Sequence, residues 1–236
     1  MNAAVYKVLS GAIVQMRRLE AASQDLANLN TSGYKREGLT FNEILADFSG
    51  RGQRAGGLVA VGEQRADLSQ GALQRTENPF DLAIEGDGFF VVQTPRGLRY
   101  TRQGTFTRSI DGKVVTPSGY PLMGDDGAVR IDGKLMEVTP EGTVLSDGVE
   151  AARFRLVRLT ASQLRREGQN LFQISGEVQP GSGVRVIQGA LEQSNVNGVE
   201  RMVTLIAIQR QFEALQRALR AMDALTERMI TEGTKI

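Results

Sequence analysis

The chain lacks cysteine and histidine altogether among its 236 residues. Without cysteine it can form no disulfide bond, no thiolate metal site and no cysteine nucleophile. Without histidine it lacks the commonest metal ligand and the commonest general base near neutral pH. No recognisable constellation of nucleophile and base replaces them. We therefore expect a protein that is not an enzyme, with no catalytic residues, no cofactor and no bound metal ion.

The sequence also lacks an excess of one charge and a long apolar run. Its 28 basic and 27 acidic residues leave a formal net charge of +1, so no overall field would attract nucleic acid or an acidic membrane surface. No window approaches the roughly 20 apolar residues of a membrane span. The N-terminus has no basic leader, and Ala12-Ile13-Val14 is too short for the core of a signal peptide. We expect no nucleic-acid partner, no membrane insertion and no cleaved signal peptide.

What the sequence does have is a helical pattern at each end. The first segment, Asn2 to about Leu29, is rich in good helix formers, and the turn-forming run 28–33 ends it. The second begins after Asn197, a predicted N-cap with Glu200 three residues later, and ends at Gly233. Both segments carry large apolar residues at 3-4 spacing, which is typical of helices that pack along other helices. The first stripe includes Val5, Leu9, Ala12, Met16, Leu19 and Leu26, and the second Leu205, Ile208, Phe212, Leu215, Leu219, Met222 and Met229.

Further apolar residues lie off these stripes, so one partner helix cannot cover them all. They are Val8 and Ile13 on the first helix and Met202, Val203, Ile206, Leu225 and Ile230 on the second. The charged residues outside the second stripe include Arg201 and the favourable i,i+4 pair Glu213 and Arg217. Simple solvation and pairing with a neighbouring subunit are both open interpretations of these charges.

Between the two helical segments the pattern becomes one of short strands. From Leu58 to about Ile187, short apolar runs alternate with glycine turns, among them Asp111-Gly112, Asp126-Gly127 and Asp147-Gly148. Asp-Gly between such runs is a strong hairpin signal, because tight turns between strands need positive φ. The middle therefore reads as an antiparallel all-β domain. The apolar residues from Leu39 to Phe48 fit either a short helix or an extended arm.

Several polar clusters have alternative interpretations that we find weaker. Asp125, Asp126 and Asp132 do not have the spacing and the final glutamate of a calcium loop. Glu85 and Asp87 are a possible carboxylate pair for glycoside hydrolysis, but Gly86 and Gly88 favour a turn. An anion site at Arg51 and Arg54 lacks aromatic neighbours and a following helix cap; the segment 49–57 is typical of a hinge.

These patterns predict an α+β fold in which long N- and C-terminal helices form a coiled-coil-like pair and an all-β domain is inserted between them. The predicted parts are a terminal helical domain from 1–33 and 190–236, a linker or arm at 34–57, and a central β domain at 58–189. Because the chain alone leaves a second apolar surface on its helices, we expect identical or related subunits to cover it in a tube or filament. The alternative is a monomer whose β domain covers that surface.

Four motifs in order along the chain resemble those of bacterial flagellar rod and hook proteins. The first, 23–35, includes Asn28, Thr31, Gly33, Tyr34 and Lys35; the second and third are 81–90 and 100–106. The last runs from Leu191 through Ser194, Asn195, Val196 and Asn197 to Met202. The short stretch between the first two motifs, with Tyr6 and Ser10-Gly11-Ala12, is more similar to proximal-rod members than to distal-rod ones.

The resemblance implies a structural subunit of the basal-body rod, exported by the flagellar type III apparatus without cleavage of a signal peptide. Its partners would be other rod proteins, proximal and distal, and copies of itself, packed through their terminal helices in the periplasm-spanning shaft that transmits torque to the hook. The alternatives are a distal-rod or hook-type subunit and, from a different class, a ligand-binding or enzymatic β domain with helical oligomerisation arms.

Overall fold

The computed structural model describes residues 3–44, 58–168, 170–181 and 183–233. The chain divides into two compact units. We call the first the helical unit; it comprises Met1–Ala27, Gly38–Gln64 and Asn197–Ile236. We call the second the β unit; it comprises Asn28–Glu37 and Arg65–Val196. The predicted hinge at 49–57 lies outside the described residues.

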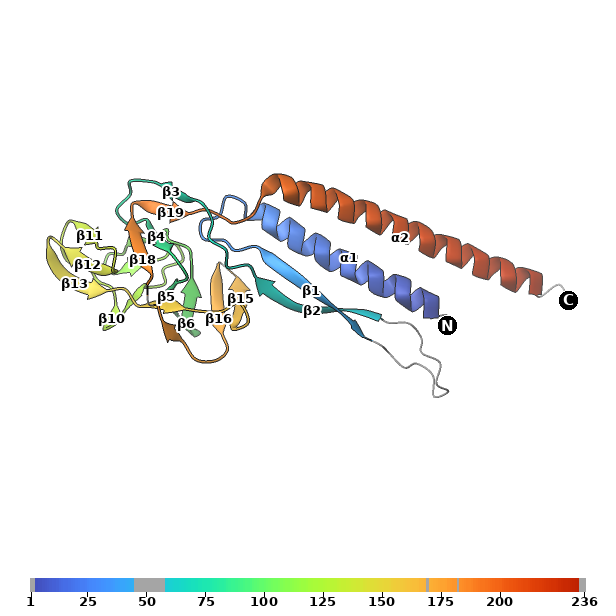
Figure 1. Cartoon of the computed structure of the whole chain (residues 1–236), viewed down its shortest axis with the longest axis horizontal. Helices are drawn as coiled ribbons and strands as arrows, with labels where there is room; N and C mark the ends of the chain where they lie inside the picture. Colours follow the sequence, from blue (N-terminus) through green and yellow to red (C-terminus); the bar gives the residue numbers. More distant parts are fainter. Residues whose placement is uncertain (1–2, 45–57, 169, 182, 234–236) are drawn as a thin grey trace. The chain divides into compact units, whose positions relative to one another are not determined.

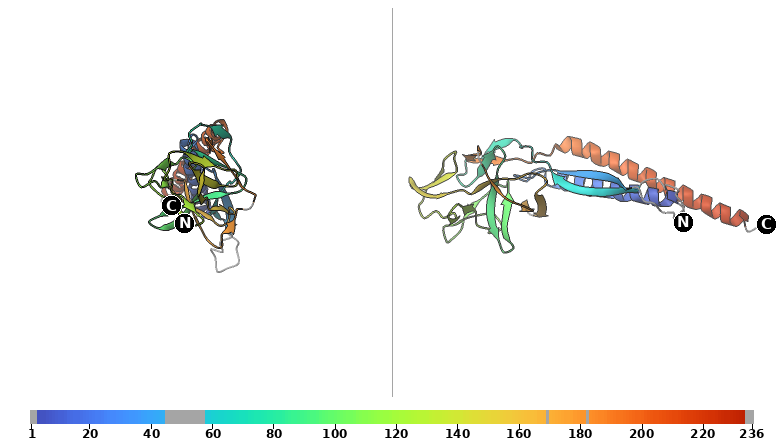
Figure 2. Two further views of the ribbon diagram at one scale, coloured as in Figure 1. Left: turned by 90° about the vertical axis from the view of Figure 1, so that its left-hand side faces the viewer. Right: turned by 60° about the horizontal axis from the view of Figure 1, so that its bottom comes forward.

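The helical unit is built on two long helices, α1 (Ala3–Ala27) and α2 (Gly198–Gly233). Asn197 caps α2 as predicted, because its side-chain Oδ1 accepts hydrogen bonds from the backbone N–H of Val199 at 3.1 Å and of Glu200 at 3.2 Å. The two helices run side by side in Figures 1 and 2. The predicted pairing of the two ends of the chain is thus confirmed.

The helix pair is antiparallel, and its register follows from two contacts. Gly11 lies beside the Leu215 side chain, and Asp25 forms an ion pair with Arg201. A step of 14 residues forward along α1 therefore matches a step of 14 residues back along α2. Continuing this register places Ala3 opposite Asp223, so α2 extends ten residues, about 15 Å, beyond the start of α1. Figure 1 shows this projection as the free end of the red helix.

The segment that fitted either a helix or an extended arm contains a strand, β1 (Glu37–Ile44). It pairs with β2 (Leu58–Ala66), and the two run along α1 in Figures 1 and 2. Ala-rich α1 and Val- and Thr-containing β1 and β2 agree with the intrinsic preferences of these residue types.

The β unit consists of small antiparallel sheets. The largest has six strands in the order β15-β16-β6-β5-β14-β17. These strands are β5 (Phe89–Thr94), β6 (Gly97–Thr101), β14 (Leu156–Arg158), β15 (Leu164–Gly168), β16 (Leu171–Ile174) and β17 (Gln179–Pro180). A three-stranded sheet joins β11 (Met136–Val138), β12 (Thr143–Ser146) and β13 (Val149–Arg153).

Four two-stranded pairs complete the β unit as described. They are β3 (Leu73–Arg75) with β19 (Ala190–Glu192), β4 (Leu82–Glu85) with β18 (Arg185–Gln188), β7 (Thr107–Arg108) with β8 (Val114–Val115), and β9 (Met123–Gly124) with β10 (Gly127–Ala128). The first two pairs bring the beginning and the end of the β unit together. In this way the motif at 81–90 meets the residues just before the last motif.

The Asp147-Gly148 turn shows why the Asp-Gly signals predicted hairpins. Both residues have left-handed backbone, with φ of +50° and +82°, and they connect β12 to β13 with Ser146 opposite Val149. Paired positive φ values match the twist of the two strands, and aspartate tolerates them better than most residues do. The Asp147 carboxylate also accepts hydrogen bonds from the N–H of Lys134 and Leu135. This aspartate therefore has a turn-forming role.

Strand β5 separates two apolar cores. Phe90 and Val92 belong to the larger core, whereas Phe89 and Val91 belong to the smaller one. Alternate side chains of a strand point to opposite faces, so a strand buried on both faces reads as a continuous apolar run. Edge-to-face aromatic pairs fix both cores: Phe90 with Phe106 at 5.3 Å between ring centroids, and Phe89 with Phe172 at 6.0 Å.

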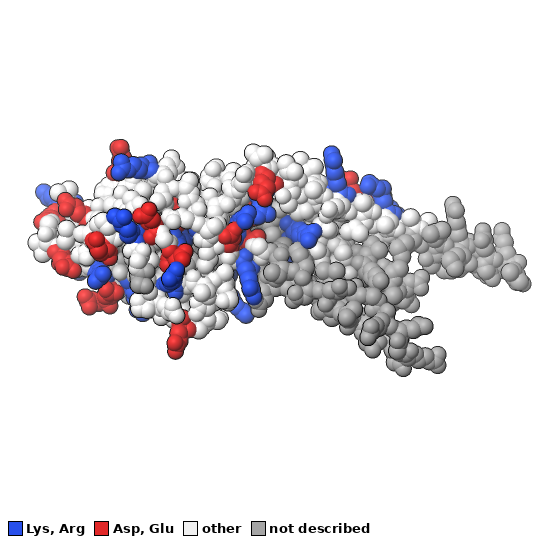
Figure 3. All heavy atoms as spheres, viewed as in Figure 1, with Lys and Arg blue, Asp and Glu red and all other residues white. Residues whose placement is uncertain are grey.

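The predicted fold class is confirmed: terminal helices contact each other, and the region between them consists of small antiparallel sheets. Over the described helices we find none that is long and apolar enough to cross a membrane. On the face of the molecule in Figure 3, blue and red side chains are mixed over the β unit, in keeping with the near-zero net charge.

Candidate assembly surface and the junction of the motifs

The predicted stripe on α2 lies against α1 over its described part. Ile208 is buried, and Leu205, Phe212, Leu215 and Leu219 are half-buried. Gly11 of α1 leaves room for Leu215, whose methyl groups lie at van der Waals distance from where a Cβ would be. Met222 and Met229 lie on α2, but their side chains are outside the described part of the structure. Large apolar residues on one helix thus pack against small ones on the other.

The burial of the α1 stripe differs from what the spacing of its apolar residues predicts. Leu19 and Leu26 are half-buried, but Leu9 and Met16 are 49% and 50% exposed. The buried positions of α1 are Val14, Ala22 and Asp25, which include small and polar residues that a search for large apolar side chains passes over. Val5 lies on α1, with its side chain outside the described part. An assembly role for Leu9 and Met16 stays a prediction, and their exposure leaves them available for it.

Several apolar residues predicted to lie off the stripes are exposed. Ile13 on α1 and Met202, Val203 and Ile206 on α2 are all about half exposed, and Val199 is 75% exposed. The side chains of Val8, Leu225 and Ile230 are outside the described part. Exposed apolar residues gathered on a helix face are unusual in a soluble monomer and typical of a protein interface. We call Leu9, Ile13, Met16, Val199, Met202, Val203 and Ile206 the exposed helix surface.

A buried ion pair sits within the helix pair. Asp25 is fully buried, and its Oδ2 lies 3.2 Å from Nε of Arg201, whose side chain is 19% exposed. Sequence analysis left Arg201 among the charges that are solvated or paired with another subunit; within this chain it pairs with Asp25 instead. Glu213 and Arg217 form the exposed i,i+4 pair that was predicted, with 3.9 Å between their charged atoms. Of these two pairs, the Asp25–Arg201 pair is the buried one, and it joins the two helices.

In the β unit, the first and last motifs meet at one buried carboxylate, Glu192. Its Oε1 accepts hydrogen bonds from Nζ of Lys35 at 2.6 Å and from the N–H of Gly71 at 2.9 Å. Its Oε2 lies 3.2 Å from a guanidinium nitrogen of Arg102, in the third motif. Lys35, Arg102 and Glu192 are all nearly inaccessible to solvent. We call these three residues the motif junction.

The motif junction buries two cations around one anion. Backbone carbonyl groups accept hydrogen bonds from both cations and so help to stabilise the excess positive charge. Lys35 also donates to the Ser69 carbonyl at 2.7 Å, and Arg102 donates to the Gly86 carbonyl, in the second motif, at 2.7 Å. The Arg102 guanidinium lies 5.1 Å from the centre of the Phe89 ring. Burial lowers the pKa of Lys35 and that of Arg102, and the attraction of Glu192 opposes both shifts. All four motifs thus contribute to one buried polar network.

The first motif enters this network through a turn that requires glycine. Thr31 Oγ1 donates to Asn28 Oδ1 at 3.2 Å, which closes the turn after α1. Gly33 has φ of +67°, and a Cβ there would lie 2.3 Å from the Arg102 carbonyl carbon. Its N–H donates to the Glu192 carbonyl at 2.7 Å. Any side chain at Gly33 would push the first and third motifs apart.

The aromatic residue of the first motif is held between an arginine and the core. Tyr34 is buried, and the Arg166 guanidinium lies 4.4 Å from the centre of its ring. Arg166 also pairs with Glu37 at 2.6 Å and donates to the Lys35 carbonyl. Stacking of this kind adds to the attraction of an ion pair in a partly desolvated place. Arg166 therefore holds three residues of the segment that follows α1, Tyr34, Lys35 and Glu37.

The last motif is bound through Asn195. Its side-chain oxygen accepts the Arg36 N–H at 2.7 Å, and its amide nitrogen donates to the carbonyls of Asp67 at 2.9 Å and Ser69 at 3.1 Å. Ser194 Oγ accepts the N–H of Val196 at 3.3 Å, and Val196 is buried. Of the motif residues predicted from sequence, Gly33, Lys35 and Asn195 bond directly to residues of this network, Asn28 and Thr31 close the turn after α1, and Asn197 caps α2.

The carboxylate clusters considered as catalytic or metal sites have other roles. Asp87 pairs with Arg158 at 2.8 Å on the surface, and this hydrogen bond lowers the pKa of Asp87. Asp132 pairs with Arg130 at 2.7 Å. In the described ranges no three acidic side chains are placed to hold a metal ion. These acids belong to turns and surface ion pairs.

Comparison with known proteins agrees with the motifs. A family model described as flagellar hook protein FlgE/F/G D1 domain matches residues 83–149, and one described as flagellar basal body rod FlgEFG protein C-terminal matches residues 187–232. The flagellar basal-body rod protein FlgF of Rhizobium meliloti is 31% identical over 98% of this chain and 97% of its own length. FlgF of Caulobacter vibrioides is 34% identical over 93% of each chain.

The chain belongs to the flagellar basal-body rod protein family. The flagellar basal-body rod protein FlgG of Bacillus subtilis is also similar, at 28% identity over 98% of each chain. The protein is therefore a structural subunit of the basal-body rod rather than an enzyme, and membership of the family implies assembly with other rod subunits. The C-terminal model covers the last motif and nearly all of α2, the element that carries most of the exposed helix surface.

Sequence reasoning missed the partners within the motif junction. Arg102 and Glu192 lie within the predicted motifs but had no predicted role, and neither Arg166 nor Asp25 was predicted to form an ion pair. The available signal was weak: Arg102 is a charge inside a stretch of buried strand residues, where a charge needs a partner. Its partner is 90 residues away, and no spacing rule identifies it.

Proposed function

We propose that this chain is a subunit of the proximal rod, and that its terminal helices assemble into the shaft that transmits motor torque to the hook. The supporting observation is the exposed helix surface together with the projecting end of α2. Covering an apolar surface of this kind with neighbouring helices stabilises the assembly by about 25 cal/mol per Å² buried. Interlocked helices resist sliding, which torque transmission requires.

Its partners in this proposal are copies of itself and the proximal and distal rod proteins, and the flagellar type III apparatus exports it without cleavage of a signal peptide. The proximal position is favoured by the short stretch between the first two motifs, whereas identity alone does not separate the two relatives, at 28–34% for FlgF and 28–29% for FlgG. The absence of cysteine suits a protein that leaves the reducing cytosol. The sibling roles, in the distal rod or the hook, would give different neighbours.

The first experiment removes residues 224–236, which include the ten α2 residues that have no α1 residue opposite them. We expect the shortened chain to keep its β unit folded, with an unchanged near-ultraviolet circular dichroism signal, and to be lost from purified basal bodies. Incorporation of the shortened chain at the normal level would contradict the proposal.

A point variant tests the same surface without shortening the chain. Ile206→Asp places a charge in the exposed helix surface, whereas Gln209→Asp places the same charge at an exposed polar position of the same helix. We expect the first to reduce incorporation at least tenfold and the second to leave it within twofold. Cross-links from residues 1–30 and 195–233 in assembled basal bodies then assign the neighbours, and cross-links mainly to distal subunits would move the protein to the distal rod.

A further inference from the structure

The three-stranded sheet β11-β12-β13 carries two unusual features, one at each end. The turn 147–148 joins β12 to β13 at one end, and the turn 139–142 joins β11 to β12 at the other. Exposed apolar side chains gather at the first end. A cavity lies at the second end, lined in part by Pro140 and Glu141.

We call Ile110, Leu135 and Val149 the apolar tip. Ile110 is fully exposed, and Leu135 and Val149 are 65% and 70% exposed. Leu135 and Val149 flank the turn 147–148, because the Asp147 N–H donates to the Leu135 carbonyl at 3.1 Å and Val149 pairs with Ser146. The hairpin that carries Ile110 lies beside them, since Arg108 donates to the Gly133 carbonyl at 2.7 Å.

The apolar tip is rigid, since hydrogen bonds join its three loops. The Gly133 N–H donates to Ser146 Oγ at 2.9 Å, the Leu135 N–H donates to the Asp147 carboxylate at 2.9 Å, and the Ile131 N–H donates to the Gly112 carbonyl at 2.8 Å. A partner therefore meets a preformed surface and need not order it, which reduces the cost of binding.

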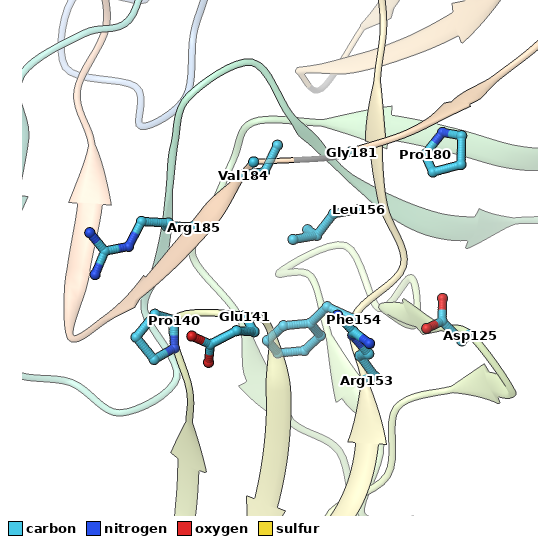
Figure 4. A pocket seen from close by; sticks show the side chains of 11 residues that line it. Asp125, Pro140, Glu141, Arg153, Phe154, Leu156, Pro180, Gly181, Val184 and Arg185 are labelled. Carbon is cyan, nitrogen blue, oxygen red and sulfur yellow. The ribbon is translucent and has the colours of Figure 1, made fainter.

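We call the cavity at the other end the end pocket; it has a volume of about 660 Å³. Its apolar lining includes Phe154 and Val184, both buried, and half-buried Leu156. Figure 4 shows Leu156 between Val184 and Phe154, with charged side chains around them. A volume of this size accommodates several apolar side chains, and an apolar floor within a polar rim is the usual anatomy of a protein contact.

The charges beside the two features complement each other. The rim of the end pocket has two cations, Arg153 and Arg185, and two carboxylates, Asp125 and Glu141. Beside the apolar tip lie exposed Asp111, Lys134 and Glu150. None of these seven side chains forms an ion pair with another residue in the described part of the chain. The carboxylates at the tip match the arginines of the rim, and Lys134 matches its carboxylates.

We propose that the apolar tip of one copy of this chain enters the end pocket of the next copy. Because tip and pocket lie at opposite ends of one sheet, each contact leaves a free tip and a free pocket, so contacts continue from copy to copy. The occupant is a second copy because both halves of the contact, with matching charge, are on the same chain. The contact goes beyond the proposed rod function, since it joins β units and does not use the exposed helix surface.

The chain contains no cysteine, so a disulfide between introduced cysteines reports this contact directly. The full-length variant Leu135→Cys, Glu141→Cys places one cysteine at the tip and one at the pocket rim. Strand β11, about 10 Å long, separates the two positions, which is too far for a disulfide within one copy. We expect mild oxidation of the concentrated protein to give a ladder of dimers, trimers and larger products.

The control variant Leu135→Cys, Ser175→Cys moves the second cysteine to an exposed site outside the pocket, and it should give at most one-tenth of the ladder. Equal ladders from the two variants, or none from the first when its near-ultraviolet signal is native, would overturn the proposal. Dimers from Leu135→Cys alone, in the amount given by the first variant, would indicate a contact between two tips and also overturn it.

The ladder should persist when residues 224–236 are also removed, because the contact uses the β unit alone. Its loss in the shortened chain, with the β unit still folded, would show that the contact depends on the helices and contradict its independence. A failure of the rod proposal would appear in basal bodies and leave the ladder unchanged, so the two proposals fail separately.

Discussion

The two units of this protein use apolar residues in opposite ways. In the β unit most of them, apart from the apolar tip, are buried in two cores on either side of β5, and even the charged residues of the motif junction are buried with partners. In the helical unit, half-exposed apolar residues remain on both helices. The β unit therefore has the structure of a finished domain, whereas the helical unit has that of one part of a larger bundle. Truncation of a side chain should affect monomer stability in the cores of the β unit and assembly on the exposed helix surface.

The largest change in the free energy of unfolding should come from a substitution in the larger core. Phe90→Ala removes a fully buried ring that contacts Phe106 and Phe154 edge to face, and such changes cost about 3–5 kcal/mol. Ile206→Ala, on the exposed helix surface, should change the free energy of unfolding by less than about 0.5 kcal/mol. Urea unfolding followed by near-ultraviolet circular dichroism measures the first, and helix signal at 222 nm measures the second. A cost above about 2 kcal/mol for Ile206→Ala would contradict the comparison, because it would mean that this residue is sealed within the monomer.

The second prediction concerns the loss of stability when a charge of the motif junction is removed. Glu192→Gln leaves Lys35 and Arg102 buried without a countercharge, and breaking a buried pair in this way costs about 3 kcal/mol or more. Glu177→Gln, an exposed glutamate of the same unit, is the matched control and should cost less than about 0.5 kcal/mol. Thermal unfolding of both variants checks this. Similar melting temperatures for the two would show that the motif junction contributes little to stability.

Local pattern was enough to predict the helices, their pairing, the antiparallel sheets and the exposed residues Ile13, Met202, Val203 and Ile206. Helix caps, Asp-Gly turns and apolar spacing are determined by neighbours in sequence, and they persist in the fold. The family motifs likewise indicated the rod before any geometry was known. Apart from the helix pairing, which followed from matching stripes at the two ends of the chain, the residues responsible for each of these features are close together in sequence.

The rest depends on residues that are distant in sequence. Glu192 meets Lys35 and Arg102 across 157 and 90 residues, and no single-sequence pattern pairs them. The face of α1 that meets α2 was obscured because small and polar residues, Ala22 and Asp25, occupy it, while large Leu9 and Met16 stay exposed. Close helix approach favours small side chains, so a rule based on large apolar residues alone does not find all the α1 residues that pack within the chain.

A smaller loss of stability is expected from removing the N-cap of α2 in the helical unit. Asn197→Ala removes the acceptor for the N–H groups of Val199 and Glu200 at the start of α2, and loss of an N-cap costs about 1 kcal/mol. We expect fraying of the first turn of α2 with the β unit unchanged, measured as faster amide hydrogen exchange at residues 199–201. Asn197→Asp, which keeps a capping oxygen, is the matched control and should preserve protection. Equal exchange in the two variants would contradict the capping role.

The smallest effect concerns acid stability of the β unit. The hydrogen bond from Arg158 lowers the pKa of Asp87 below its usual value of 3.8 in the folded protein. The unfolded chain therefore binds this proton more readily than the folded one, so the pair stabilises the fold above pH 3.8, and this contribution is lost as the pH falls through the lowered folded-state pKa. Because both side chains are more than half exposed, we expect Asp87→Asn to lower the melting temperature only slightly at pH 7. The difference from the original chain should disappear near pH 2, and a difference that is equal at pH 7 and pH 2 would mean that the Asp87 charge is not its cause.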